Sequence, residues 1–221
     1  VGYGSDALGG VIHFYSRTPL INQINKYDAS FSSSYDFSQK TSKNSITLEY
    51  SATKWAVLQY FSISNFGDIV MGNRRPHGYN DWGKVFEFSE NTNKRYLKSP
   101  TTNTDPNIQR NSAYSQFDFL QKWVYHSEDR FKFSLNLQGS QSSNILRLDK
   151  LMEYRAGKLR FARWEYGPQK RLLVSPQIHL TGNSRWLKSG KIIIAAQVLE
   201  ESRIMRKFGS LDRDCLLYTS P

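Results

Sequence analysis

The chain has 221 residues, a formal net charge of +11 and a mean hydropathy of -0.59. Its longest apolar run covers only residues 192–196, far fewer than the roughly 18 apolar residues of a spanning helix, which excludes a helical membrane protein. The single cysteine, Cys215, excludes an internal disulfide framework and a cysteine-built metal site. The basic residues are dispersed through the expected loops instead of gathering on one helix or cleft, which argues against a nucleic-acid partner.

Two segments alternate apolar and polar side chains almost without interruption. In residues 27–37 the odd positions carry Tyr, Ala, Phe, Ser, Tyr and Phe, and the even positions carry only Asp and Ser. Residues 131–140 repeat the pattern, with Phe and Leu on odd positions and polar residues on even ones. Since side chains on a strand alternate between its faces, one face is apolar and the other polar. A membrane strand of about 9 to 11 residues has this pattern, with one face toward lipid and the other toward a polar lumen.

Weaker alternation predicts five further strands, which brings the predicted total to seven. The five additional segments are residues 45–52, 55–66, 112–125, 171–181 and 191–203.

The links between these strands are of two kinds. Short links at residues 52–54 and 126–130 alternate with long ones at 67–111 and 141–170. An up-and-down barrel of the outer membrane has short periplasmic turns and long extracellular loops. A compact soluble domain rarely contains so long a loop without secondary structure.

A glycine-rich motif lies near the start of the chain. Gly2, Gly4 and Ala7 fit the loose dinucleotide-binding pattern G-x-G-x-x-A, but no strand precedes them and a strand-like run begins at Val11, which leaves no room for the required helix. The stretch instead resembles the last plug segment of TonB-dependent outer-membrane receptors, a G-x-x-A-x-G-G-V-I run that leads into the first barrel strand. The matching positions are Gly4, Ala7, Gly9, Gly10, Val11 and Ile12.

Weaker resemblance to a subgroup of these receptors continues in residues 71–79, 164–171 and 208–213. The resemblance implies an all-β antiparallel transmembrane β-barrel of about 22 strands, filled by an N-terminal plug. Residues 1–20 would be the end of the plug, and residues 21–213 the first part of the barrel. Residues 214–221 continue no strand pattern and are expected to be a non-matching, truncated tail.

The resemblance also implies a function. Members of the family import scarce, bulky solutes such as iron-siderophore complexes or haem, with energy passed from the TonB complex to a short box before the plug. That box is missing here, and the chain is expected to be a fragment. The implied location is the outer membrane, with lipid and lipopolysaccharide as further partners. The sequence predicts no enzyme activity, no resident cofactor and no metal site.

Candidate solute-binding residues lie on the two long loops. The second loop carries seven basic residues against three acidic ones, which favours an anionic ligand, and arginine offers bidentate geometry for carboxylates. His77 could ligate haem iron. Contact with lipopolysaccharide or simple solvation are the alternatives for these loops. The candidates are Arg74, Arg75, His77, Tyr79, Trp82, Arg147, Tyr154, Arg163, Trp164 and Tyr166.

Two other classes of protein compete with the transporter. One is an outer-membrane barrel enzyme, which would need a Ser and a His on facing strands, and the sequence assembles no such pair. The other is a soluble carbohydrate-binding β-sandwich, in which a second protein layer would cover the apolar stripes.

Overall fold

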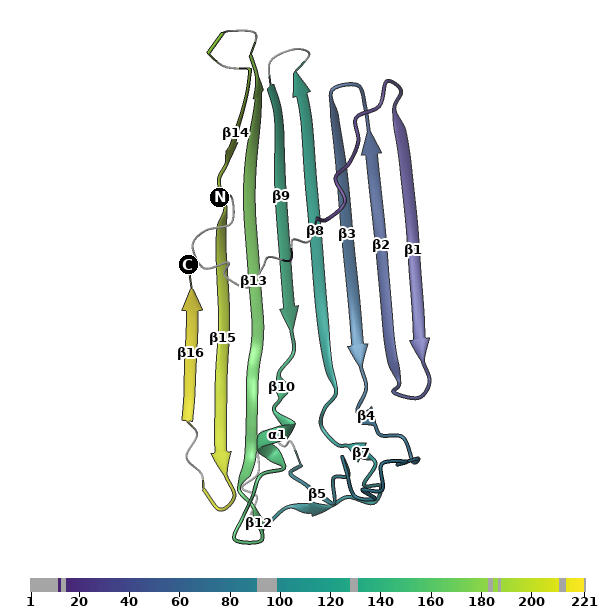
Figure 1. Cartoon of the computed structure of the whole chain (residues 1–221), viewed down its shortest axis with the longest axis vertical. Coiled ribbons are helices and arrows are strands. Elements are labelled where there is room, and N and C mark those ends of the chain that lie inside the picture. Colours follow the sequence, from purple (N-terminus) through teal and green to yellow (C-terminus); the bar gives the residue numbers. More distant parts are fainter. Residues whose placement is uncertain are drawn as a thin grey trace.

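One large antiparallel sheet dominates the computed structural model (Figure 1). The structure describes residues 12, 15–90, 99–127, 131–182, 185–186, 188–210 and 214–220. The sheet has ten strands, in the order β1-β2-β3-β8-β9-β13-β15-β16, and β10 and β14 both pair with β13. The all-β, antiparallel class predicted from the sequence is confirmed. The sheet is open and is not closed into a barrel, and the described residues include no plug domain.

Eight long strands form the path of the sheet. They are β1 (Lys26–Asp36), β2 (Thr41–Ser51), β3 (Trp55–Phe66), β8 (Tyr114–Ser127), β9 (Phe131–Ser142), β13 (Phe161–Thr181), β15 (Ala196–Lys207) and β16 (Asp214–Ser220). The shorter elements are β4 (Ile69–Val70), β5 (Glu87–Phe88), β6 (Thr101–Thr102), β7 (Ile108–Gln109), β10 (Ile145–Leu146), α1 (Leu148–Leu151), β11 (Tyr154–Arg155), β12 (Lys158–Leu159) and β14 (Ser189–Ile193).

The long strands form an up-and-down meander, and their links differ at the two ends. The turns after β2, β8 and β13 lie at one end of the sheet, called the turn end (Figure 1). The long links between β3 and β8 and between β9 and β13 lie together at the other, the loop end. These two links contain all the short strands except β14, together with α1.

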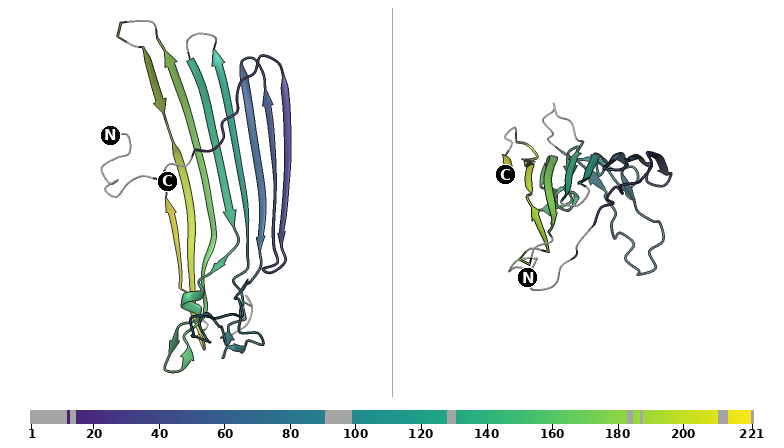
Figure 2. Two further views of the ribbon diagram at one scale, coloured as in Figure 1. Left: turned by 45° about the vertical axis from the view of Figure 1, so that its right-hand side comes forward. Right: turned by 90° about the horizontal axis from the view of Figure 1, so that it is seen from above.

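One face of the sheet carries an apolar row that crosses seven of its eight long strands. The register aligns a single row across seven strands, with Phe31 opposite Ile46, Ile46 opposite Phe61, and Phe61 opposite Phe119. The same row continues through Gly139, Leu172 and Val198. These apolar side chains are not covered, since Phe31 is 71% exposed and Val198 56%. Figure 2 shows a single layer, and no second sheet of the described residues packs on this face.

The next row, on the opposite face, is polar. One residue further along β1, the register aligns Ser32, Ser45, Ser62, Asp118, Ser140 and Arg171. The N-terminal segment crosses this face, because Lys122 Nζ on β8 donates to Ser16 O at 2.9 Å and Arg17 pairs with Glu49 on β2. An extended segment therefore lies on the polar side.

Aromatic rings form a continuous row on the apolar face near the turn end. Tyr27 contacts Tyr50 at 4.6 Å between centroids, Tyr50 contacts Trp55 at 4.6 Å, and Trp55 stacks near Trp123 at 6.3 Å. This aromatic row spans β1, β2, β3 and β8. Toward the loop end of the same face, Tyr35 contacts the ring of Phe37 at 4.8 Å.

The structure corrects the sequence prediction in three places. β13 begins at Phe161, ten residues before the expected start, and a register shift between Gly167 and Lys170 accommodates Pro168, which could not donate to a regular ladder. The last predicted strand is divided into β14 and β15. Residues 214–220, expected to continue no strand, form β16 and pair with β15.

Among the described residues, no helix is both long enough and apolar enough to cross a membrane.

Candidate functional site

The described part of the long link between β3 and β8, residues 67–90 and 99–113, is a platform built around one buried amide. Asn103 is 4% exposed, and its Nδ2 donates to Val85 O at 2.8 Å and to Ile108 O at 2.9 Å. Its backbone N–H donates to Phe86 O at 2.7 Å. Since these bonds satisfy buried carbonyl groups of the link, Asn103 fixes the loop where the sequence predicted irregular structure.

Four predicted site residues gather at the tip of this platform. His77 lies 5.7 Å from the ring of Tyr79 and 5.6 Å from that of Trp82, centroid to centroid. Tyr79 N–H donates to His77 Nδ1 at 3.1 Å. Arg75 Nε donates to Trp82 O at 3.1 Å and Arg75 Nη2 to Asn107 Oδ1 at 2.7 Å. This tip cluster presents two exposed rings, Tyr79 at 72% and Trp82 at 62%. Arg74 is exposed beside it.

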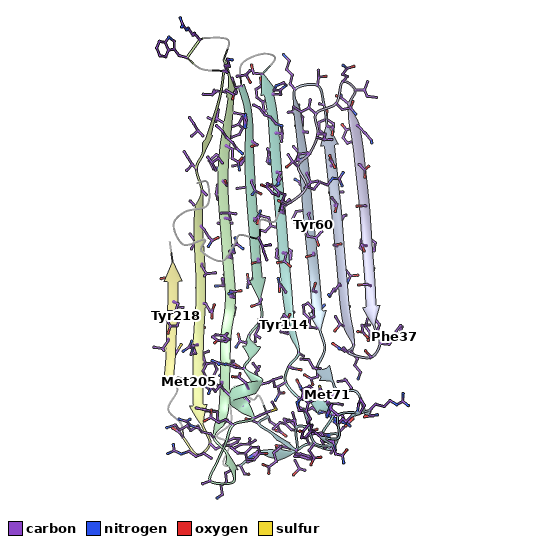
Figure 3. All side chains as sticks on the ribbon, in the orientation of Figure 1. Phe37, Tyr60, Met71, Tyr114, Met205 and Tyr218 are labelled. Atoms are coloured by element: carbon purple, nitrogen blue, oxygen red, sulfur yellow. The ribbon has the colours of Figure 1, made fainter. Side chains whose placement is uncertain are left out.

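A second group of predicted residues meets at the loop end of β13. The Arg147 guanidinium lies 4.7 Å from the ring of Trp164, and Arg203 from β15 lies 5.3 Å from the same ring. Tyr166 contacts Trp164 edge to face at 5.6 Å, and the phenol oxygen of Tyr166 accepts from Arg147 Nη1 at 3.4 Å. We call Arg147, Trp164, Tyr166 and Arg203 the arginine–tryptophan stack. Tyr218 of β16 extends it, with its ring 6.0 Å from Arg203. Met205 and Tyr218 are labelled in Figure 3.

The register explains why the stack forms. Tyr166 and Arg203 are directly opposite on neighbouring strands, as are Trp164 and Met205. Arg147 reaches the stack because its N–H donates to Trp164 O at 3.0 Å, at the start of α1. Trp164 was expected on a loop, and its position on β13 places it 4% exposed under the two guanidinium groups.

The stack is electropositive. Arg147 Nε donates to Asp149 at 2.9 Å, and this hydrogen bond raises the pKa of Arg147 above its ordinary value, so the group stays charged. Arg203 Nε is buried and has no hydrogen-bond partner. Two guanidinium groups set against aromatic rings, with Asp149 hydrogen-bonded to Arg147, form a site that favours a planar anion.

Arg163 and Tyr154 serve the structure of the loop end. The Arg163 Nε donates to Glu165 Oε1 at 2.8 Å, and Asn144 Nδ2 donates to the same oxygen at 2.7 Å. Glu165 is fully buried, and Arg206, also buried, lies directly opposite Arg163 in the register. Arg163 is 8% exposed, so it is not presented to a solute.

Tyr154 joins the two long links, because its hydroxyl donates to Glu87 Oε2 at 3.3 Å. Burial and the neighbouring carboxylate of Glu87 raise the pKa of Tyr154 above its ordinary value, so the phenol keeps the proton that it donates. The hairpin β11–β12 therefore lies against β5.

Nine of the ten predicted loop residues thus fall into three sets, the tip cluster, the stack and the two structural residues, and Arg74 lies beside the tip cluster. The sequence did not point to Arg203 and Tyr218, because the pattern of one strand does not show which residues of the neighbouring strands lie opposite it. Of the glycine-motif residues, Ile12 is 84% exposed, and Gly4, Ala7, Gly9, Gly10 and Val11 lie outside the described residues. Within the described part of the chain, no group of three or more His, Cys, Asp or Glu is placed to hold a metal ion.

Comparison of the chain with protein-family models, with curated proteins and with solved structures finds no match.

Proposed function

We propose that the chain forms part of the wall of an outer-membrane transporter of the TonB-dependent type. Its loop end would receive a scarce, bulky anionic solute such as an iron chelate or haem. The partners on the two sides of the wall would be lipid and lipopolysaccharide outside and a plug inside, with energy supplied by the TonB complex.

One observation carries the proposal, the contrast between two neighbouring rows of the same sheet. The row from Phe31 to Val198 is apolar on seven strands and uncovered, whereas the adjacent row from Ser32 to Arg171 is polar. A membrane-spanning sheet requires this contrast, because its backbone is satisfied by the ladder and only its outer side chains meet acyl chains.

The dimensions of the apolar face agree with this interpretation. The aromatic row begins at Tyr27, and the second aromatic pair begins at Tyr35 on the same strand and face. The eight steps between them cover about 27 Å at roughly 3.4 Å per residue. An outer-membrane barrel has an apolar band of about 25 Å flanked by aromatic girdles.

The stack and the tip cluster supply the capture site in this proposal. Both lie at the loop end, which would face outward because the longer links of such barrels are extracellular. The two arginines of the stack would bind carboxylate or phenolate groups of the solute, and the exposed rings of Tyr79 and Trp82 would contact its apolar parts.

The location is tested with two adjacent single-cysteine variants. Phe61 and Ser62 point to opposite faces of β3, so each is replaced by cysteine in a Cys215→Ser background and labelled with a small fluorophore. The chain is refolded in ordinary and in brominated detergent micelles. Bromine should quench the label at residue 61 strongly and the label at residue 62 weakly. Equal quenching at both positions would overturn the membrane assignment.

Transport is tested in cells that express the reading frame containing the chain. Uptake of radiolabelled iron as anionic chelates should require the gene and should stop when a proton ionophore collapses the inner-membrane gradient. Uptake that persists without the gradient would exclude a TonB-dependent mechanism.

A further inference from the structure

A second charged surface lies at the turn end of the polar face. Four side chains are directly opposite one another on four successive strands, with His126 opposite Lys132, Lys132 opposite His179, and His179 opposite Lys191. All four are exposed. We call them the basic row.

The basic row places two lysines on one exposed surface. Lys132 and Lys191 lie two strand spacings apart, about 10 Å at roughly 4.8 Å per spacing, with the His179 strand position between them. The acidic residues that the structure describes near this end of the polar face, Asp28 and Glu49, belong to β1 and β2, and Glu49 is already paired with Arg17. Lys122, one of the nearest charged groups on the same face of β8, adds to the positive charge.

We propose that the basic row is the docking surface for an extended, acidic polypeptide segment that lies across β8, β9, β13 and β14. The segment carries carboxylates at alternate positions. Three strand spacings make the row about 14 Å long, and residues i, i+2 and i+4 of an extended chain span about 13 Å with their side chains on one side. The span of three such carboxylates therefore matches the length of the row.

The N-terminal segment of the chain gives a precedent for this geometry. It crosses the polar face of β8 at Lys122, where the ammonium group binds Ser16 O and, at 3.3 Å, Thr18 Oγ1. An extended backbone thus fits against this face. A lipid headgroup is disfavoured as the occupant, because the row faces away from the apolar side.

A labelled heptapeptide with glutamate at alternate positions and serine between them is titrated against the refolded chain in zwitterionic micelles at low salt. Fluorescence anisotropy reports binding. The double variant Lys132→Gln/Lys191→Gln is compared with Lys43→Gln/Lys158→Gln, which removes the same charge elsewhere. The row variant should bind about tenfold more weakly than the control variant, as expected for two lost ion pairs.

Three results would overturn the proposal. The first is equal loss of affinity in both double variants, which would indicate attraction to net charge alone. The second is equal binding of a peptide with glutamine in place of glutamate. The third is failure of the wild-type chain to bind the glutamate peptide. The titration measures binding to the basic row alone, so its outcome does not depend on the solute proposed for the loop end.

Discussion

Replacing Glu165 by glutamine should loosen the loop end more than any other single change of charge there. Glu165 is fully buried, and its Oε1 accepts from Arg163 and from Asn144. The E165Q side chain keeps the volume and loses the charge, which leaves the buried guanidinium group of Arg163 without the carboxylate that it contacts. Removing one partner of a buried ion pair costs about 3–5 kcal/mol. A local opening equilibrium should therefore shift by about two to four powers of ten.

Hydrogen exchange read by mass spectrometry measures this effect on peptides that cover residues 143–167. Their protection should fall at least a hundredfold in E165Q, and far less in E153Q, whose carboxylate on the same link is only half-buried. The double variant Arg163→Met/Glu165→Leu should recover much of the protection, since an apolar pair can replace a buried ion pair. If E165Q exchanges no faster than E153Q, the carboxylate does not hold this end of β13 and the reasoning fails.

Three further predictions concern the stack, the apolar face and the loop hairpin. Trp164→Leu removes the ring that orients two guanidinium groups, so the affinity for ferric citrate should fall about tenfold. Intrinsic fluorescence follows the binding. Trp82→Leu, away from the stack, should lower the affinity less. Gly139→Ala places a Cβ 2.0 Å from the Phe119 ring and should cost about 1–3 kcal/mol in urea unfolding, a cost that should largely vanish in a Phe119→Ala background. Arg160 and Lys150 lower the pKa of Glu153 below its ordinary 4.5. The stabilisation from these contacts is present above pH 4.5 and is lost as the pH falls through the lowered pKa. Proteolysis of the hairpin β11–β12 should therefore accelerate only in acid.

The long strands of this fold could be predicted from the sequence wherever one face is apolar and the other polar. Residues 27–37 and 131–140 have a period of two and match β1 and β9 closely. The first ten residues of β13 escaped prediction because the register shift after Gly167 breaks the alternation and Pro168 reads as a loop signal. β16 has apolar residues on both faces, which gives no period to detect.

The candidate site was predicted only as a set of residue types. Arg147, Trp164 and Tyr166 were candidates, but their convergence depends on the N–H of Arg147 bonding to Trp164 O. Arg203 completes the stack from a strand about forty positions later in the chain, and only the register brings it opposite Tyr166. Arg163 has the guanidinium group expected of an anion-binding residue, but that group already donates to Glu165.

The two outermost long strands of the sheet have an outward row of backbone groups that no other described strand pairs. Along β1 every residue of Lys26–Asp36 is exposed, so this border is a template for lateral growth. The unpaired edge strands of two copies can pair with each other. Purified material should therefore form longer assemblies as its concentration rises, unless another strand pairs with β1 first.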